Sequence, residues 1–321
     1  MYPTISHLIK DVTGIWISLP VQTFGFFMAL SILTGYYFLN SEVKRKGKTH
    51  LIQSFVTKKG RVVRPHEQIN TSVLIALVSG IIGARLFSIL EYPNAFLEAP
   101  LYTLLSPSDF TYYGGLIIGA IAVAFYARTV NLKFVHLADA AAPALMIAYA
   151  IGRLGCHLSG DGDWGIDNLG ASPAIFGFLP DSFWACNYPH NVIGAGVPIA
   201  NCFDDYCMQL SKPVFPTALH ESIVCSLLFL VLWFLRKRII VPGVMLGCYL
   251  ILNGIERFLV EQIRIEVEFT WFGIRFKQAE AIALSFLTVG ICMLLFILKV
   301  RQNKKAVITS TYLKFNNEYN R

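Results

Sequence analysis

The stretch GRLGCHLSGDGDWG, from Gly152 to Gly165, joins an arginine to a glycine-rich acidic turn. Arg153 ends an apolar run, where an ionisable side chain is costly unless a partner or a ligand compensates for its charge. Glycines such as Gly160 let the backbone turn tightly and approach a ligand closely. Backbone N–H groups beside a fixed guanidinium favour an anion such as phosphate. The alternative is that Arg153 extends to the lipid headgroups and the glycines only end a helix.

A second group of polar side chains recurs at helical spacing further along the chain. The residues that share one helical face, at intervals of four, four and three, are Asn253, Arg257, Glu261 and Arg264. We expect Glu261 to hold Arg257 and Arg264, leaving guanidinium donors directed toward the interior of a helix bundle. Ion pairing without any ligand is the alternative interpretation.

Two further side chains could transfer a proton. His220, in the segment FPTALHES, is suited by its side-chain type to accept a proton near neutral pH. A histidine at the membrane interface, hydrogen-bonded to an extramembrane segment, is the plainer interpretation. Tyr113 precedes Gly114 and Gly115 in TYYGGLIIGA, and is predicted at the outer membrane boundary, where aromatic residues are common. Close helix packing is the simpler role for the two glycines.

The composition indicates which elements must position these groups. Hydrophobic residues make up 55% of the 321 residues, charged residues only 15%, and the mean hydropathy is +0.55. A soluble domain carries about a quarter charged residues, so the composition indicates a polytopic membrane protein. The net charge of +7 does not imply nucleic-acid binding, because the lysines and arginines lie at the ends of apolar runs.

Apolar runs long enough to cross about 30 Å of hydrocarbon predict an all-α protein with seven transmembrane helices. The predicted spans are residues 19–39, 71–91, 112–130, 137–155, 217–235, 242–261 and 280–298. We expect a single polytopic membrane domain over residues 1–301, a small head inserted at about 156–215, and a polar tail at 302–321. Residues 1–18 could form an interfacial helix or an ordinary exposed terminus.

The distribution of charge predicts the orientation in the membrane. The connector at 40–70 holds eight basic residues, whereas the segment at 154–211 holds none and contains six aspartates. Because basic loops stay in the cytoplasm, the N-terminus and the head are predicted outside and the tail in the cytoplasm.

The head also contains three cysteines, Cys186, Cys202 and Cys207. In an oxidising compartment two of them are expected to pair, and Cys202 and Cys207 are close enough in sequence, but spacing does not decide the pairing. A zinc site is not expected. The sequence predicts no metal and no cofactor.

Several segments match motifs of one enzyme family. The most specific are DAAAPALMIAYAIGRLG, from Asp139 to Gly155, and NGIERFLVEQIR, from Asn253 to Arg264. Further matches are GARLFSILEYP, YGGLIIG and PTALHE, in the second, third and fifth predicted spans. From about residue 21 to residue 298 the sequence resembles the prolipoprotein diacylglyceryl transferases, with the same seven-span layout and outer N-terminus.

The resemblance implies a reaction at the outer leaflet of the cell (inner) membrane. Family members transfer a diacylglyceryl group from phosphatidylglycerol to the thiol of the lipobox cysteine in a prolipoprotein signal peptide, and release glycerol phosphate. By position, Arg153 and Arg257 correspond to arginines essential in the family, and Glu261 to their acidic partner. Arg153, Arg257, His220 and Tyr113 are then expected to take part in the chemistry. The residues expected to contact the substrates are Arg153, Arg257, Glu261, Arg264, Gly114, Gly115, Gly160, Gly165 and Asn253.

The sequence departs from the family pattern within the expected site. Tyr113 stands where the family has histidine, Cys156 where it has asparagine, and His220 and Asn253 where it has tyrosines. The turn GDGDWG is one residue longer than the GELWG of the family. A phosphate pocket is therefore better supported than any particular base or acceptor. The alternatives are a transferase with the same donor and another acceptor, and a non-catalytic phospholipid-binding or assembly protein.

Overall fold

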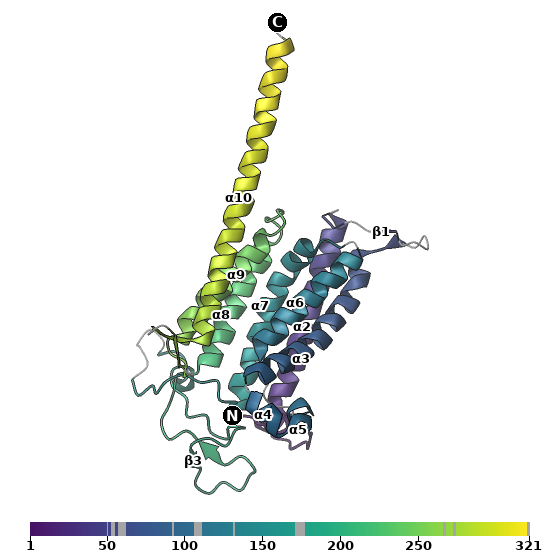
Figure 1. Cartoon of the computed structure of the whole chain (residues 1–321). Helices are drawn as coiled ribbons and strands as arrows, with labels where there is room; N and C mark the ends of the chain where they lie inside the picture. The colour runs from purple at the N-terminus through teal and green to yellow at the C-terminus, as the bar shows by residue number, and fades with distance from the viewer. Residues whose placement is uncertain are drawn as a thin grey trace. The chain divides into compact units, whose positions relative to one another are not determined.

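The computed structural model describes residues 1–321 except 50, 53–54, 57–61, 92, 106–110, 131, 171–176, 266–267, 272–273 and 320–321. The described chain is mostly helical (Figure 1). Its helices are α1 (Ile5–Thr13), α2 (Thr23–Lys48), α3 (Ile69–Glu91), α4 (Pro93–Glu98), α5 (Pro100–Leu105), α6 (Tyr112–Thr129), α7 (Phe134–Ser159), α8 (Thr217–Leu235), α9 (Val244–Glu261) and α10 (Gln278–Tyr319), with 3₁₀ turns η1 (Pro65–Gln68) and η3 (Asp181–Phe183).

The described strands form three short antiparallel pairs. These are β1 (Phe55–Val56) with β2 (Val62–Val63), β3 (Val197–Pro198) with β4 (Met208–Gln209), and β5 (Glu268–Trp271) with β6 (Ile274–Lys277). In the last pair, Phe269 lies opposite Phe276. Each pair joins nearby segments within one connection between helices. The strands therefore order these loops, and the fold itself is helical.

A helix is present at each position predicted for a span, and most of their ends agree within a few residues. Within the described part of the chain, five helices are long and apolar enough to cross a membrane: those within Thr23–Lys48, His66–Glu91, Phe134–Ser159, Thr217–Leu235 and Gln278–Asn303. Gly114–Thr129 is apolar but shorter, and α9 carries Glu256, Arg257 and Glu261 in its last turns. The protein is thus a helical multi-pass membrane protein, and seven crossings stay a prediction.

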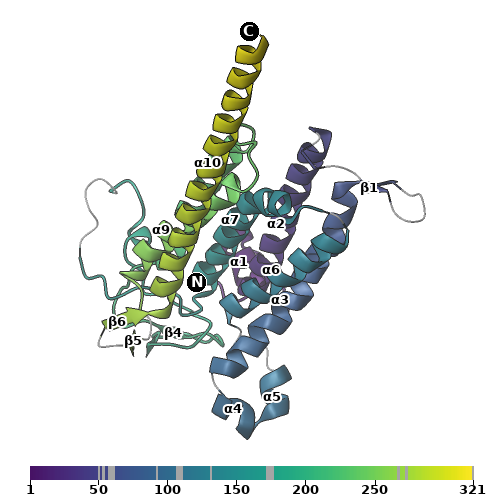
Figure 2. The same cartoon turned by 45° about the horizontal axis from the view of Figure 1, so that its top comes forward.

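The chain divides into two compact units, the first of which consists of Tyr36–Ala140. Its core joins Val43, Ile69, Ala127 and Leu137. Helices α3 and α6 lie side by side in this unit (Figure 2). A Cβ on Gly114 would lie 2.5 Å from the carbonyl oxygen of Gly83, so glycine permits this close approach.

The other unit comprises Met1–Gly35 and Ala141–Arg321. Here α9 packs along α10, where a Cβ on Gly254 would lie 2.8 Å from the carbonyl oxygen of Ala283. Helix α10 continues to Tyr319, so most of the polar segment predicted as a tail is helical (Figure 1).

The head between α7 and α8 has little regular structure and is held by a small core and a disulfide. Cys202 is bonded to Cys207, with 5.6 Å between their Cα atoms, so these two cysteines make the pair that the sequence left open. Cys186 is a free thiol, buried with Tyr188 and Val214.

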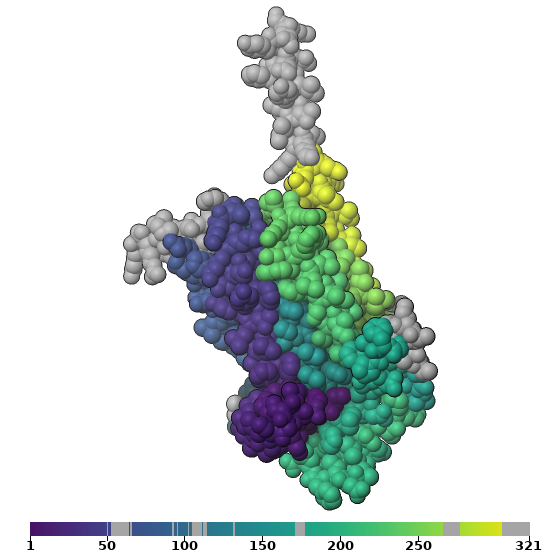
Figure 3. Space-filling model, turned by 180° about the vertical axis from the view of Figure 1, so that it is seen from behind, coloured from purple at the N-terminus to yellow at the C-terminus, as the bar shows by residue number. Residues whose placement is uncertain are grey.

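The N-terminal residues form a helix that contacts the head. Helix α1 ends at Gly14, which has a φ of 74° and closes the helix in the left-handed conformation. His7 of α1 contacts Asp204 of the head at 2.9 Å. In the space-filling view the N-terminal segment appears in dark purple, beside the green of the head (Figure 3). The N-terminal segment is therefore a helix bound to the head and not an ordinary exposed terminus.

Candidate functional site

Arg153 and two arginines about a hundred residues further along the chain, Arg257 and Arg264, meet around one buried glutamate. Glu221, in the first turns of α8, has a side chain only 1% exposed. Its Oε2 lies 2.5 Å from Nε of Arg153, and its Oε1 lies 3.0 Å from Nη1 of Arg257. Nη1 of Arg264, just beyond α9, is 3.8 Å from the same Oε1. Helices α7, α8 and α9 therefore each contribute to one cluster of charges, which we call the arginine cluster.

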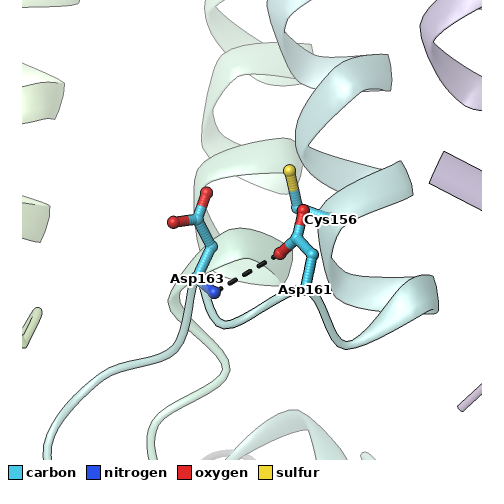
Figure 4. A group of neighbouring side chains, drawn as sticks. All are labelled: Cys156, Asp161 and Asp163. Carbon is cyan, nitrogen blue, oxygen red and sulfur yellow. Dashed lines mark hydrogen bonds between the residues drawn. The ribbon is translucent and has the colours of Figure 1, made fainter. Parts of the chain in front are cut away.

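The glycine-rich turn after α7 closes the arginine cluster with a second carboxylate. Arg153 donates to Oδ2 of Asp163, and Arg264 donates to Oδ1 of the same carboxylate. The hydroxyl of Thr217, the first residue of α8, donates to the backbone carbonyl of Asp163 at 3.0 Å. The backbone N–H of Asp163 donates to Asp161 at 3.3 Å, drawn as the dashed line in Figure 4. The turn thus holds Asp163 between two guanidinium groups.

Two further side chains complete the cluster. The hydroxyl of Tyr149, one turn before Arg153 on α7, accepts a hydrogen bond from Nε of Arg153 at 3.0 Å. It lies 3.4 Å from both Arg257 and Glu221. Glu261, which is fully buried, lies 3.4 Å from Nη2 of Arg257. Glu261 and Arg257 therefore pair as the helical spacing predicted, while the described ion pairs of Arg264 go to Asp163 and Glu221.

The shape of the turn depends on two of the predicted glycines. Gly160 has a φ of 66°, a conformation that side chains rarely adopt, and it follows directly on α7. A Cβ on Gly165 would lie 2.5 Å from the carbonyl oxygen of Ile263, because Gly165 forms a bridge with Arg264. Both glycines are therefore required by the backbone path, and Gly165 brings the turn against the end of α9.

Burial and charge act in opposite directions on the two aspartates of the turn. Burial raises the pKa of Asp161 above its ordinary value, and the neighbouring Asp163 raises it further. Burial also disfavours the charged form of Asp163, but Arg153 and Arg264 outweigh that effect and lower its pKa. Asp163 is therefore the firmly ionised member of the pair.

Cys156, Asp161 and Asp163 come close enough to suggest a cation site. One ligand atom from each lies within 4.8 Å of the others, and Figure 4 shows the thiol and the two carboxylates gathered at the end of α7. However, Asp163 already contacts two guanidinium groups, which would repel a metal ion at this position. The guanidinium groups at this corner therefore disfavour a metal ion.

Two predicted residues lie near the cluster without joining its described contacts. His220 precedes Glu221, and its Nε2 donates to the carbonyl of Phe183 in the head at 2.8 Å. This bond places the ring proton on Nε2 and leaves Nδ1 as the acceptor in the neutral form. Asn253 is half-buried on α9, one turn before Arg257. A role for either residue stays a prediction.

The remaining predicted residues belong to the other compact unit. Tyr113, Gly114 and Gly115 form part of the first turns of α6. The two glycines pack against α3, the simpler of the roles expected for them. The side chain of Tyr113 lies outside the described residues. Their participation in the site stays a prediction.

Three members of the cluster were not predicted from the sequence: Glu221, Asp163 and Tyr149. Glu221 is an acidic residue inside an apolar span, and this is the signal that identified Arg153. A role was predicted only for its neighbour His220. Asp163 lies in the glycine-rich acidic turn, for which no arginine partner was predicted. Tyr149 carried no signal, because a tyrosine in an apolar helix is common.

Known proteins are similar to this chain over most of its length. A family model described as prolipoprotein diacylglyceryl transferase matches residues 12–296. The phosphatidylglycerol–prolipoprotein diacylglyceryl transferase of Leptospira interrogans serovar copenhageni is 28% identical over 268 residues, which are 76% of this chain and 71% of the relative. The protein of that name from Leifsonia xyli is 31% identical over 217 residues, 63% of this chain and 58% of the relative. The one from Marinomonas sp. is 25% identical over 263 residues, 80% and 86% of the two chains.

The matched region contains every residue of the arginine cluster, from Tyr149 on α7 to Arg264 after α9. It also spans all but the end of the last apolar helix. A match of this extent leaves only the two ends of the chain outside it. The chain belongs to the prolipoprotein diacylglyceryl transferase family.

Proposed function

We propose that this protein transfers a diacylglyceryl group from phosphatidylglycerol to the thiol of the lipobox cysteine of a prolipoprotein. The observation that carries the proposal is the meeting of Arg153, Arg257 and Arg264 at one corner of the helical unit. Guanidinium groups match the oxygens of a phosphate in geometry and charge. Relatives with the transferase name over most of this chain support the same reaction.

The chemistry needs a stabilised leaving group. The sulfur of the acceptor attacks the carbon of the diacylglyceryl group that is bonded to the phosphate oxygen. A C–S bond forms and the C–O bond to the phosphate breaks. The electron pair of the broken bond leaves with glycerol phosphate. Arg153 and Arg257, with Arg264 beside them, would stabilise the growing negative charge on that phosphate. Glu221 and Glu261 would keep the guanidinium groups in place for this task.

The acceptor thiol must lose its proton during the attack. We assign this proton to His220 or Tyr113. His220 is adjacent to Glu221, and the bond from its Nε2 to Phe183 leaves Nδ1 as the proton acceptor. Substrate contacts of Asn253, Gly160 and Gly165, and separately those of Gly114 and Gly115 in the other unit, are part of the proposal.

The reaction would take place on the extracytoplasmic side of the cell (inner) membrane. The absence of lysine and arginine from residues 154–211, in contrast to the basic connector at 40–70, supports this orientation. We propose seven crossings, with the head on the outer face.

The test is transfer by purified protein in proteoliposomes. Protein, phosphatidylglycerol and a lipobox peptide are mixed, and lipidated peptide is measured by mass spectrometry. Wild-type protein should yield product, and Arg153→Ala should not. Lys212→Ala removes a cation of the head that is 59% exposed and paired with Asp167, so it should keep activity.

Failure of this test has two forms. Folded wild-type protein that gives no product but binds phosphatidylglycerol through Arg153 would exclude the lipobox acceptor and favour another acceptor. Absence of both product and lipid binding would overturn the proposal altogether.

A further inference from the structure

Among the described residues, the charges of the arginine cluster balance before any substrate arrives. Its three guanidinium groups face an equal number of carboxylates, those of Asp163, Glu221 and Glu261. Lys277 adds a cation by donating to the carbonyls of Glu261 and Arg264, and Asp161 adds a carboxylate beside Asp163. Glu256, buried near Glu221 and Arg257, can only make the balance more negative. A phosphate added to this site would therefore be an excess negative charge.

An excess charge in a poorly hydrated site is expensive, so a carboxylate must leave when a phosphate enters. The three carboxylates differ in their freedom to do so. Glu221 and Glu261 have side chains only 1% and 0% exposed, on helices α8 and α9. The side chain of Asp163 is 30% exposed and lies on the turn after α7. Only Asp163 can reach water by rotation of its own side chain.

The two contacts of Asp163 are also those that a phosphate would make. One carboxylate oxygen accepts from Arg153 and the other from Arg264. The backbone of Asp163 is fixed separately, by Thr217 and by Asp161. The side chain can therefore leave the arginines while the turn keeps its place. Figure 4 shows the Asp163 carboxylate projecting from the turn, apart from that of Asp161.

We propose that Asp163 is an internal competitor for the phosphate: its carboxylate occupies the phosphate position between Arg153 and Arg264, and a phosphate-bearing headgroup displaces it. Asp163 thereby sets the affinity of the site for its donor. This inference rests on the proposed function for the identity of the donor, but the competition itself requires only a phosphate ligand.

Binding measurements with Asp163→Asn test the competition. The purified full chain is titrated with short-chain phosphatidylglycerol and, in a separate arm, with glycerol 3-phosphate. Loss of the competing charge should tighten binding by about tenfold, as expected when an occluded state is removed. Asp167→Asn, a change of the same kind on an exposed aspartate of the head, should leave the affinity unchanged. Weaker or unchanged binding by Asp163→Asn would overturn the proposal and make Asp163 a support for the arginines.

A second measurement uses the wild-type protein and does not depend on whether the variant folds. Carboxyl groups are labelled with a carbodiimide and a small amine, and each site is quantified by mass spectrometry. Labelling of Asp163 should rise by about threefold with ligand, since its side chain would go from 30% exposed to fully hydrated. Labelling of Asp167 should not change, and protection of Asp163 by ligand would refute displacement.

The two arms separate this inference from the proposed function. If glycerol 3-phosphate binds tightly and phosphatidylglycerol does not bind, the proposed lipid donor is wrong. The proposed competition between Asp163 and a phosphate would still hold. If phosphatidylglycerol binds and is turned over, but Asp163→Asn shows no increase in affinity, the proposed function would hold and the competition by Asp163 would be wrong.

Discussion

Glu221 of α8 bridges Arg153 of α7 and Arg257 of α9, with its two carboxylate oxygens 2.5 Å and 3.0 Å from their respective nitrogens. This one buried side chain ties three helices together. Tyr149 reinforces the bridge from α7. The consequence is that the positions of the arginines depend on Glu221 as much as on their own helices.

Replacement of Glu221 by glutamine should therefore destabilise the protein and disable the site together. Loss of one partner from a buried ion pair costs about 3–5 kcal/mol, because the remaining charges stay buried. Thermal unfolding in detergent should shift to lower temperature, and Arg153-dependent lipid binding should weaken. Asp205→Asn, an exposed aspartate of the head, serves as the control. Unchanged stability of Glu221→Gln would show that the bridge is dispensable.

Arg257→Lys should retain the charge but lose the forked geometry. We expect turnover to fall by about 10²–10³-fold, the usual cost of removing one donor aimed at developing negative charge. Arg238→Lys, at the far end of α8 over the ring of Phe234, is the matched control and should keep its activity. Steady-state kinetics in proteoliposomes measure both. Equal activity of the two variants would argue against a contact between Arg257 and the phosphate.

His220→Ala distinguishes proton transfer from lipid binding. If His220 accepts the thiol proton, kcat should fall by about 10²–10⁴-fold while phosphatidylglycerol binding stays intact. Full turnover in the variant would transfer this role to another group, and Tyr113→Phe would be the next variant to measure. Loss of lipid binding would instead indicate that the bond from His220 to Phe183 only supports the head.

Asp161→Asn should alter the dependence of stability on pH in a defined direction. Because the pKa of Asp161 is raised on folding, the folded state holds its proton more tightly, and the contribution of Asp161 to stability is lost as pH rises above its ordinary value of 3.8. The variant should unfold at a higher temperature than wild type at neutral pH. This difference in unfolding temperature should disappear at a pH below 3.8, the ordinary pKa of Asp161.

For Asp163→Asn we expect a change in stability of the opposite sign to that of Asp161→Asn. The pKa of Asp163 is lowered on folding, so its contribution is present above the ordinary value of 3.8 and is lost as pH falls through the lowered pKa. This variant should unfold at lower temperature than wild type at neutral pH. Shifts of the same sign in the two variants would contradict the opposing environments of the two aspartates.

Gly165→Ala should disrupt the junction between the turn and α9. The added methyl group would lie 2.5 Å from the carbonyl oxygen of Ile263 and 2.9 Å from Cβ of Phe215, neither of which is a flexible side-chain end. Gly152→Ala adds the same group where no atom lies within 4 Å, so it should fold normally. Yield of folded protein by size-exclusion chromatography compares them. A well-folded, active Gly165→Ala protein would contradict the packing described here.

The orientation in the membrane can be tested by labelling in intact cells. A cysteine placed at Leu169 in the head, which is 71% exposed, should react with a membrane-impermeant maleimide. A cysteine placed at Arg238 should react only after the membrane is opened. If the cysteine at Arg238 reacts in intact cells and the cysteine at Leu169 does not, the proposed orientation in the membrane is wrong.

Much of the architecture could be predicted from the sequence because membrane helices are a local property. Twenty or so apolar residues must form a helix in hydrocarbon whatever surrounds them, so the spans could be placed without tertiary information. The pair Arg257 and Glu261 was likewise predictable, since four residues on a helix fix their separation. The glycine requirement at Gly165 followed from the density of glycines in the turn.

The rest was decided by tertiary structure. Whether Glu221 meets Arg153, and whether Asp163 meets Arg264, depends on how α7, α8 and α9 pack, and no local spacing encodes that contact. The sequence determined that costly charges lie at the ends of these helices and must find partners. Only the folded chain decided which partners they find, because Coulomb attraction acts between atoms near in space, however far apart they lie along the chain.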